Sequence, residues 1–306
     1  MLGHNKQRKL LLNMALSGDL PHAFLFSGQE QLGKKNIATE LAKFLFCEDK
    51  KKPCGECRSC KDIAKNCHPD FIANFNEPGK EIQIKDIRDL IWKLSLKPYI
   101  APFKIALIDN AHLMNTESQS CFLKTLEEPK GKVLIILVTS YPEMLLSTIL
   151  SRVQQIKFFP VESGEIKKYL LKSGESEEKA GHIAALSMGR PGRAMELALD
   201  NDKIEECEKI IADLKKIRAS DLGIRFQYAK KVLADEDSNF KLKEILESWL
   251  NYFRTMLLEK ISGKEKDGYS ISKIKKIINK IQTIYYLVST TNVSQKLALE
   301  IVMMEI

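Results

Sequence analysis

Near its start the chain runs from an apolar segment into a glycine loop and then into a helical segment, and this order limits the possible folds. Residues 22–26 (HAFLF) predict a short buried strand, and residues 36–46 carry apolar side chains at helical spacing. Between them, Gly28 and Gly33-Lys34 stand at the spacing of a phosphate-binding loop. Strand, loop and helix thus follow in the order that a phosphate-binding loop requires. A glycine-rich turn before an unrelated helix is the alternative interpretation.

Lys35 follows the loop lysine at the position where a working loop has a serine or threonine. In such a loop backbone N–H groups cradle the phosphates, the lysine reaches the outer phosphates, and the hydroxyl holds Mg²⁺. A lysine side chain has three donors, no acceptor and a positive charge, so it repels the cation that the hydroxyl would bind. Gly28, Gly33, Lys34 and Lys35 are therefore interpreted as a degenerate nucleotide-binding loop without its metal ligand.

A second part of a nucleotide site is expected where residues 104–109 (KIALID) form a buried strand that ends at Asp109. P-loop enzymes hold Mg²⁺ with an acidic residue at this place. In hydrolases of this kind a glutamate normally follows and accepts a proton from the attacking water. This chain has Asn110 instead, and an amide is a far poorer base. Asp109 as the N-cap of a helical segment at residues 111–114 is the alternative interpretation.

Two further polar positions lie next to later strands. The strand at residues 133–138 ends in Thr139-Ser140, where Thr139 is suitably placed to contact a γ-phosphate, although hydroxyl residues are common at strand ends. Ser151-Arg152-Val153 opens the last predicted strand, and an arginine at a domain edge can reach out of its own subunit. From the residues alone, an exposed arginine in a solvated turn is the favoured interpretation of Arg152.

Four of the seven cysteines, Cys47, Cys54, Cys57 and Cys60, fall within a short segment after the loop helix. Two successive C-x-x-C steps aim thiolates at one centre, and Cys47 supplies the fourth corner of a tetrahedral zinc site. Four thiolates leave no open coordination position, so the zinc would be structural and not catalytic. Unliganded cysteines or a redox C-x-x-C pair are the alternatives.

The chain has 306 residues and 44% apolar content, which allow two or three domains with their own cores. Up to about residue 160, helical segments alternate with strand-like runs at residues 24–27, 71–75, 105–108, 133–139 and 156–159. This alternation predicts an α/β domain with a mainly parallel sheet, and only helical patterns follow. We expect an α/β domain at residues 1–160 with a zinc module at about 47–68, a small helical domain at 161–203, and an all-α domain at 204–306.

Charge and apolar run lengths limit the surroundings of the chain. Its longest apolar stretches, such as residues 133–138, are too short to span a bilayer, and its polar first residues lack the apolar core of a secretory signal. A cytoplasmic protein without a membrane partner is expected. The net charge of +8 is compatible with a nucleic-acid partner, but the lysines are scattered, and a basic solvated surface explains them equally well.

Several stretches together resemble one protein family. They are residues 20–26 (LPHAFLF), the four-cysteine module, residues 123–129 (LKTLEEP), Ser151-Arg152, residues 189–194 (GRPGRA), and Asn292 with residues 297–300 (LALE). Over nearly its whole length the chain resembles bacterial DNA polymerase III clamp-loader subunits of the AAA+ superfamily, and most closely the delta-prime subunits. Residues 123–129 and the four cysteines are the most specific of these motifs.

This resemblance implies a P-loop AAA+ module, built from the α/β domain and a helical lid, and a C-terminal collar domain that joins other subunits in a hetero-pentamer. With motor (gamma/tau) and delta subunits, such a chain helps to load the sliding clamp onto primer-template DNA. In delta-prime subunits the Ser-Arg motif presents an arginine to ATP held by a neighbouring subunit. The resemblance therefore implies this role, in trans, for Arg152.

The chain departs from the clamp-loader pattern at Val153 and Gly192, and Cys47 and Cys54 are two residues closer together than in the best-known delta-prime sequences. Val153 stands where the Ser-Arg motif usually continues with cysteine, and the third residue makes no charge contact in the implied role. Gly192 stands where motor subunits place a sensor arginine on the lid, although Arg190 and Arg193 flank it and are possible substitutes.

Lys35, Asn110 and Gly192 all argue against ATP hydrolysis in this subunit. The sequence therefore predicts a non-hydrolysing stator, with no ATPase turnover of its own, that donates Arg152 to its neighbour. Whether the degenerate loop still binds ATP is left open. One alternative is an ATP-hydrolysing motor-type subunit, and another is a zinc-containing DNA-binding module on an inactive AAA+ scaffold.

Overall fold

The computed structural model describes residues 2–74, 80–233, 238–263 and 268–306 of the chain. These residues form two units. One comprises the chain up to Tyr169 together with Gly189–Arg193, and the other comprises Leu170–Met188 and Ala194–Ile306. The predicted domains at residues 1–160, 161–203 and 204–306 rest on changes of sequence pattern, and their boundaries stay predictions.

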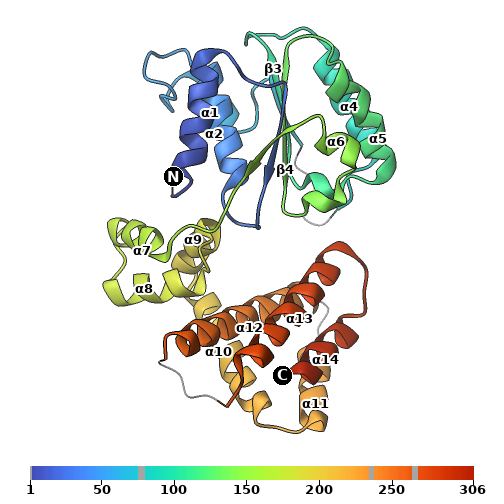
Figure 1. Cartoon of the computed structure of the whole chain (residues 1–306). Helices are drawn as coiled ribbons and strands as arrows, with labels where there is room; N and C mark the ends of the chain where they lie inside the picture. The colour runs from blue at the N-terminus through green and yellow to red at the C-terminus, as the bar shows by residue number, and fades with distance from the viewer. Residues whose placement is uncertain (1, 75–79, 234–237, 264–267) are drawn as a thin grey trace. The chain divides into compact units, whose positions relative to one another are not determined.

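A five-stranded sheet forms the centre of the first unit (Figure 1). Its strands are β1 (Ala23–Ser27), β2 (Phe71–Asn74), β3 (Lys104–Ile108), β4 (Val133–Thr139) and β5 (Gln154–Lys157). Their order is β2-β3-β4-β1-β5, and each neighbouring pair is parallel, so the predicted α/β fold is confirmed. The last strand begins at Gln154, earlier than the predicted 156–159. Phe75, which the sequence assigns to the second strand, lies outside the described residues.

Helices cover both faces of this sheet (Figure 1). On one face lie α1 (Asn5–Ser17), α2 (Lys34–Phe46) and α3 (Arg58–Ala64), and on the other α4 (Ile84–Ser95), α5 (Thr116–Glu127) and α6 (Ser147–Leu150). Successive residues of a strand point to opposite faces. Phe24 and Phe26 of β1 thus pack with the first group of helices, and Ala23 and Leu25 with the second. Both faces are apolar because a parallel sheet is buried between helices.

The strand order brings the ends of three strands to one edge of the sheet. β1 lies beside β4, with Ser27 opposite Thr139, and β3 lies on the other side of β4. Because parallel strands end at the same edge, the loop after β1, Asp109 after β3 and Thr139 on β4 meet there. The short 3₁₀ turns η1 (Ala111–Leu113) and η2 (Pro142–Met144) follow β3 and β4.

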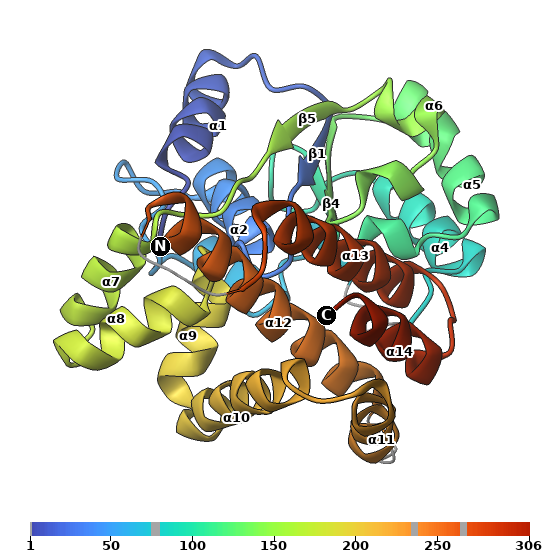
Figure 2. The same cartoon turned by 60° about the horizontal axis from the view of Figure 1, so that its bottom comes forward.

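The described residues of the second unit form helices and their connections (Figure 2). Its helices are α8 (Glu177–Leu186), α10 (Asn201–Arg218), α11 (Leu222–Val232), α12 (Ser238–Ile261), α13 (Ile271–Thr290) and α14 (Gln295–Glu305). The chain also has α7 (Ser163–Lys172) and α9 (Pro191–Leu199), which contribute residues to both units. Leu214, Trp249, Phe253, Ile277 and Leu299 are buried in the core of the second unit. No helix among the described residues is both long and apolar enough to cross a membrane.

Asp70, just before β2, fixes the segment that leads into β3. Its buried carboxylate accepts hydrogen bonds from the backbone N–H groups of Tyr99, Ile100 and Ala101, each at 2.8 Å. Burial by itself raises the pKa of Asp70, but the three donors outweigh burial, and the resulting pKa lies below the usual value. The charged carboxylate therefore stabilises the fold.

We expect Asp70→Asn to lower the free energy of unfolding by about 2 kcal/mol at pH 7, because hydrogen bonds to a charged group contribute about 1.5–3 kcal/mol. The folded pKa lies below the unfolded value of about 3.9. This stabilisation is therefore present above the unfolded pKa and is lost as the pH falls through the folded pKa. Urea unfolding of both proteins at pH 7 and pH 3 measures it. Asp89→Asn, at an exposed position of α4, is the control, and an equal loss in both variants would contradict this role.

Candidate functional site

The glycine loop begins in a place that excludes any side chain. Gly28 follows β1 with φ of 147°, and a Cβ atom there would lie 2.4 Å from the carbonyl oxygen of Phe158. Its N–H donates to the carbonyl of Thr139 at 3.3 Å. Glycine is required because the backbone passes so close to the segment after β5. The loop then reaches Gly33, which caps the N-terminus of α2.

Lys34, the first residue of α2, folds back onto its own loop. Its Nζ donates to the carbonyl oxygens of Gly28 and Gln29, both at 2.5 Å, and to Ser140 Oγ at 3.2 Å. Burial lowers the pKa of Lys34 to about 8, against the opposing effect of the carboxylates of Glu30 and Asp109. The ammonium is therefore mostly charged at pH 7. The predicted loop lysine thus lies at the start of the helix that follows the glycine loop, and two carbonyl groups of that loop accept its hydrogen bonds.

Lys35 forms an ion pair with Asp109, the acidic residue after β3. Lys35 Nζ lies 3.4 Å from Asp109 Oδ2, and Asp109 Oδ1 accepts the N–H of Asn110 at 3.0 Å. The structure therefore brings together two of the predicted site residues, with the ammonium in front of the carboxylate. The alternative of Asp109 as an N-cap does not hold, because Asn110 is the residue that precedes η1, and its side chain makes no capping hydrogen bond.

Thr139 and Ser140 have different surroundings at the end of β4. Thr139 is buried, and its hydroxyl accepts the N–H of Tyr141 at 3.0 Å and lies 3.1 Å from His112 Nδ1. Ser140 is the one that contacts Lys34. The contact of Thr139 with a γ-phosphate stays a prediction, whereas its neighbour Ser140 is the residue that contacts the loop lysine.

Two segments that the sequence did not connect with the loop also contact its backbone. The N–H of Gly192, in the first turn of α9, donates to the carbonyl of Gln31 at 2.8 Å. A Cβ at position 192 would lie 2.8 Å from that same oxygen. His4 is buried, and its Nε2 donates to the carbonyl of Leu32 at 2.9 Å. A local sequence pattern cannot predict these contacts, because Gly192 and His4 are distant in sequence from the loop residues that they contact.

Arg152 lies on the turn between α6 and β5, with a side chain that is 35% exposed. Its Nη2 lies 2.6 Å from Glu127 Oε1, and its Nη1 donates to the carbonyl of Thr148 at 2.9 Å and to Ser151 Oγ at 3.2 Å. β5 is the edge strand of the sheet, beside β1. The sequence analysis did not predict the contact of Arg152 with Glu127.

The four predicted cysteines converge. Their Sγ atoms all lie within 4.8 Å of one another, and a tetrahedral site with Zn–S bonds of 2.3 Å has sulfur atoms about 3.8 Å apart. Cys47 follows the end of α2, Cys57 caps α3, and Cys60 lies within α3. The donor set and its spacing therefore fit a metal ion with four thiolate ligands.

Backbone N–H groups point at these sulfur atoms. Those of Cys54, Cys57 and Cys60 donate to Sγ of Cys47, Cys54 and Cys57, at 3.4, 3.3 and 3.4 Å. The hydrogen bond from Cys60 N–H lowers the pKa of Cys57 to about 7, whereas burial raises the pKa of Cys60 to about 12. A metal ion held by these four cysteines would displace the Cys60 proton, because the thiolate is the ligand.

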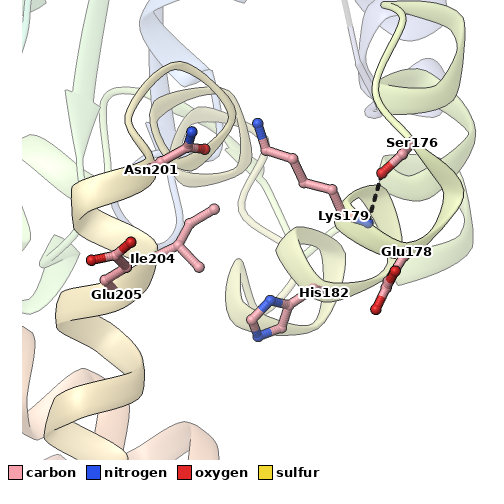
Figure 3. A pocket seen from close by; sticks show the side chains of 7 residues that line it. All are labelled: Ser176, Glu178, Lys179, His182, Asn201, Ile204 and Glu205. Carbon is pink, nitrogen blue, oxygen red and sulfur yellow. Dashed lines mark hydrogen bonds between the residues drawn. The ribbon is translucent and has the colours of Figure 1, made fainter.

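A separate hollow of about 530 Å³ in the second unit is lined by residues of α8 and α10 (Figure 3). They are Ser176, Glu178, Lys179, His182, Asn201, Ile204 and Glu205. Lys179 pairs with Glu175 at 3.1 Å, and His182 Nε2 lies 3.5 Å from Glu208 Oε1. Side chains of both charges line the hollow, and its two basic groups already contact carboxylates, so we assign it no ligand.

A family model matches the first half of the chain. Residues 3–162 match the family model described as DNA polymerase III, delta subunit. The chain belongs to this family. The matched region includes the sheet, the glycine loop, the cysteine cluster and Arg152, whereas Gly192 lies beyond it. The resemblance to DNA polymerase III subunits is confirmed.

Individual relatives agree with this family. The Bacillus subtilis DNA polymerase III subunit delta' is 33% identical over 208 residues, 66% of this chain and 61% of the relative. The Mycoplasma genitalium subunit gamma/tau is 31% identical over 288 residues, 90% of this chain and 48% of the relative. The chain thus spans less than two thirds of the length of these two relatives. A subunit delta' of Pseudomonas aeruginosa is 28% identical over 263 residues, 84% of this chain and 77% of the relative.

A solved structure supports the fold. The gamma subunit-related protein of DNA polymerase III from Thermotoga maritima gives a TM-score of 0.53 at 18% identity, and the match covers 96% of this chain and 97% of that one. At this identity the likeness shows the fold, which is a parallel sheet between helices followed by a helical region.

Proposed function

We propose that the chain is a stator subunit of the DNA polymerase III clamp loader, which hydrolyses no ATP itself and donates Arg152 to the ATP site of a neighbouring motor subunit. With motor (gamma/tau) and delta subunits in a hetero-pentamer, it helps to load the sliding clamp onto primed DNA. The relatives named delta' and gamma/tau support membership of such an assembly.

The ion pair between Lys35 and Asp109 carries the stator part of this proposal. Mg²⁺ needs oxygen ligands at about 2.0–2.1 Å in octahedral geometry. Lys35 supplies no oxygen, and its ammonium, 3.4 Å from Asp109 Oδ2, neutralises the carboxylate and repels the metal. A fixed positive charge therefore takes the place of the divalent ion that hydrolysis requires.

Two further residues favour the same conclusion. Asn110, in the left-handed region with φ of 51°, stands where a hydrolase has the carboxylate that activates water. Gly192 contacts Gln31 so closely that any side chain at this position collides with the loop backbone. An arginine could not be accommodated there without moving the first turn of α9 away from the loop. Base, metal ligand and lid arginine are thus all replaced, while Arg152 remains at an exposed turn.

The cysteine cluster has a structural part in this proposal. We assign Zn²⁺ to Cys47, Cys54, Cys57 and Cys60 because four thiolates at this spacing make a closed tetrahedral site, without a position for substrate. The ion would join the end of the loop helix α2 to α3. Its contribution is to the folding of this segment and not to catalysis.

We expect the isolated chain to release no phosphate from Mg²⁺-ATP above the rate of its Lys34→Ala variant, because neither a metal ligand nor a base for water is present at the loop. Steady-state phosphate release measures this.

ATP titrations with and without Mg²⁺ are expected to give the same affinity, since Lys35 already provides the charge at Asp109. The Lys35→Thr variant, which returns a hydroxyl to this position, is the comparison for metal dependence.

A motor-type ATPase is the second candidate, and the match to a gamma/tau subunit over 90% of this chain favours it. Turnover by the isolated chain that disappears in Lys34→Ala would establish this candidate and exclude the stator. Salt-dependent DNA binding by the chain alone, lost on Cys57→Ser, would instead favour a zinc-containing DNA-binding module.

A further inference from the structure

We propose that Glu127 positions the guanidinium of Arg152 for its action on the neighbouring ATP site, an inference that rests on the proposed function. Glu127 belongs to the LKTLEEP segment, residues 123–129, which contributes no group to the loop, the acidic strand end or the cysteine cluster. Its place in the structure is beside Arg152. The segment therefore has a role at the edge of the subunit that serves another subunit.

The contacts of Arg152 fix the plane of its guanidinium. Nη2 lies 2.6 Å from Glu127 Oε1, and Nη1 donates to the Thr148 carbonyl and to Ser151 Oγ. Arginine has five N–H donors in one rigid plane, so contacts on both terminal nitrogens leave a single orientation. These three contacts use three donors, and the others remain available for phosphate oxygens. Without Glu127 the guanidinium keeps only the two hydrogen bonds of Nη1, and its Nη2 end is no longer held.

Glu127 itself is held in place because α5 ends there. Leu126 is buried, and its carbonyl accepts a hydrogen bond from His22 Nε2 at 2.9 Å. The last carbonyls of a helix have no partner within the helix, so a side-chain donor at this point fixes the helix end. Pro129 stops the helix from continuing. His22 stands immediately before β1, so the strand that carries the glycine loop also anchors Glu127.

The same helix also fixes the turn that carries Arg152. The buried amide of Gln119 on α5 donates to the carbonyl of Met144 at 3.1 Å and accepts the N–H of Leu146 at 2.8 Å. α6 begins directly afterwards, and the N–H of Arg152 donates to the Ile149 carbonyl at 3.0 Å. Both partners of the ion pair are therefore placed by α5, which makes their separation a property of the fold.

Because this ion pair is partly exposed, its effect on the orientation of Arg152 can be measured without a large change in the stability of the fold. The Arg152 and Glu127 side chains are 35% and 48% exposed, and exposed ion pairs contribute only about 0–1 kcal/mol to folding. The removal of the carboxylate is thus expected to leave the fold intact and to change only how well Arg152 is oriented. Pre-ordering of a catalytic group reduces the entropy lost in the transition state.

The test is ATP hydrolysis by the reconstituted clamp loader with clamp and primed DNA, read at the motor site next to this subunit. We expect Glu127→Gln to lower kcat by about three- to tenfold, the range for release of one long side chain, without a change in KM. Glu128→Gln, the exposed neighbouring carboxylate, is the matched control and should retain the full rate. Thermal melting should give the same Tm for both variants.

A double variant distinguishes positioning from a general structural effect. In the Arg152→Ala background, Glu127→Gln is expected to cause no further fall in kcat. A fall of the same size in that background, or a rate in Glu127→Gln that equals or exceeds that of the unaltered subunit, would overturn the positioning role. Arg152→Ala alone tests the donation of Arg152 separately from its positioning by Glu127. If it leaves the rate unchanged, the donated arginine itself is wrong; if only Glu127→Gln has no effect, the error lies in the positioning.

Discussion

Arg152→Ala is expected to lower ATP hydrolysis at the adjacent motor site of the reconstituted loader by about 10³-fold or more. An arginine supplied in trans stabilises charge that develops on the transferred phosphoryl group, and in GTPases it contributes about 10³- to 10⁵-fold to the rate. The other motor subunits do not depend on Arg152 and would continue to hydrolyse ATP. The phosphate-loop lysines of those subunits are therefore substituted, so that only the site next to this chain contributes to the rate. The measurement is single-turnover hydrolysis in the presence of clamp and primed DNA.

Two comparisons make this result specific to the guanidinium. Arg152→Lys keeps the charge but loses the planar fork of donors, so it is expected to recover only part of the rate. Arg58→Ala removes an arginine whose side chain is 82% exposed on α3 and should leave the rate unchanged. An unaltered clamp- and DNA-stimulated rate in Arg152→Ala would remove the arginine from the proposed function.

Removal of one cysteine ligand is expected to have the largest effect on stability. Cys60→Ser should abolish binding of one Zn²⁺ per chain and lower Tm by roughly 10 °C, the shift for a loss of about 4 kcal/mol in a domain of this size. Structural zinc sites contribute folding free energy directly, because the site does not exist in the unfolded chain. Metal analysis and thermal melting, before and after treatment with a chelator, measure both quantities.

Cys67→Ser is the matched control for the metal site. Cys67 is exposed and lies outside the cluster of four, so its substitution should change neither zinc content nor Tm. If Cys67→Ser and Cys60→Ser lose metal equally, or if the chelator leaves the Tm of the unaltered chain unchanged, the four-thiolate site is wrong.

Most of the fold was predictable because it depends on local patterns. Strands such as residues 133–139 are continuous apolar runs, and helices such as residues 36–46 carry apolar side chains at helical spacing. The alternation of the two predicts a parallel sheet with helices on both faces. The start of β5 was less predictable, since Gln154 and Gln155 pair with β1 at the sheet edge although they are polar. An edge strand needs the backbone ladder more than an apolar side chain.

The candidate sites were predictable to different degrees. The cysteine cluster follows from spacing alone, because two C-x-x-C steps place their thiols close together whatever the rest of the chain does. The partner of Lys35, by contrast, depends on β3 and β1 lying on either side of β4. The same holds for Ser140, which reaches Lys34 only because β4 is the direct neighbour of β1.

The sequence by itself determined the building blocks: a strand, loop and helix with Lys35 in place of a hydroxyl, four cysteines at ligand spacing, and an arginine just before the last strand of the sheet domain. These are properties of residues close together in the chain. Tertiary structure alone decided that Lys35 faces Asp109, that Gly192 closes on Gln31, and that Glu127 holds Arg152. Each of these contacts joins segments distant in sequence, and such contacts are set by strand order and helix packing, which short-range periodicity does not encode.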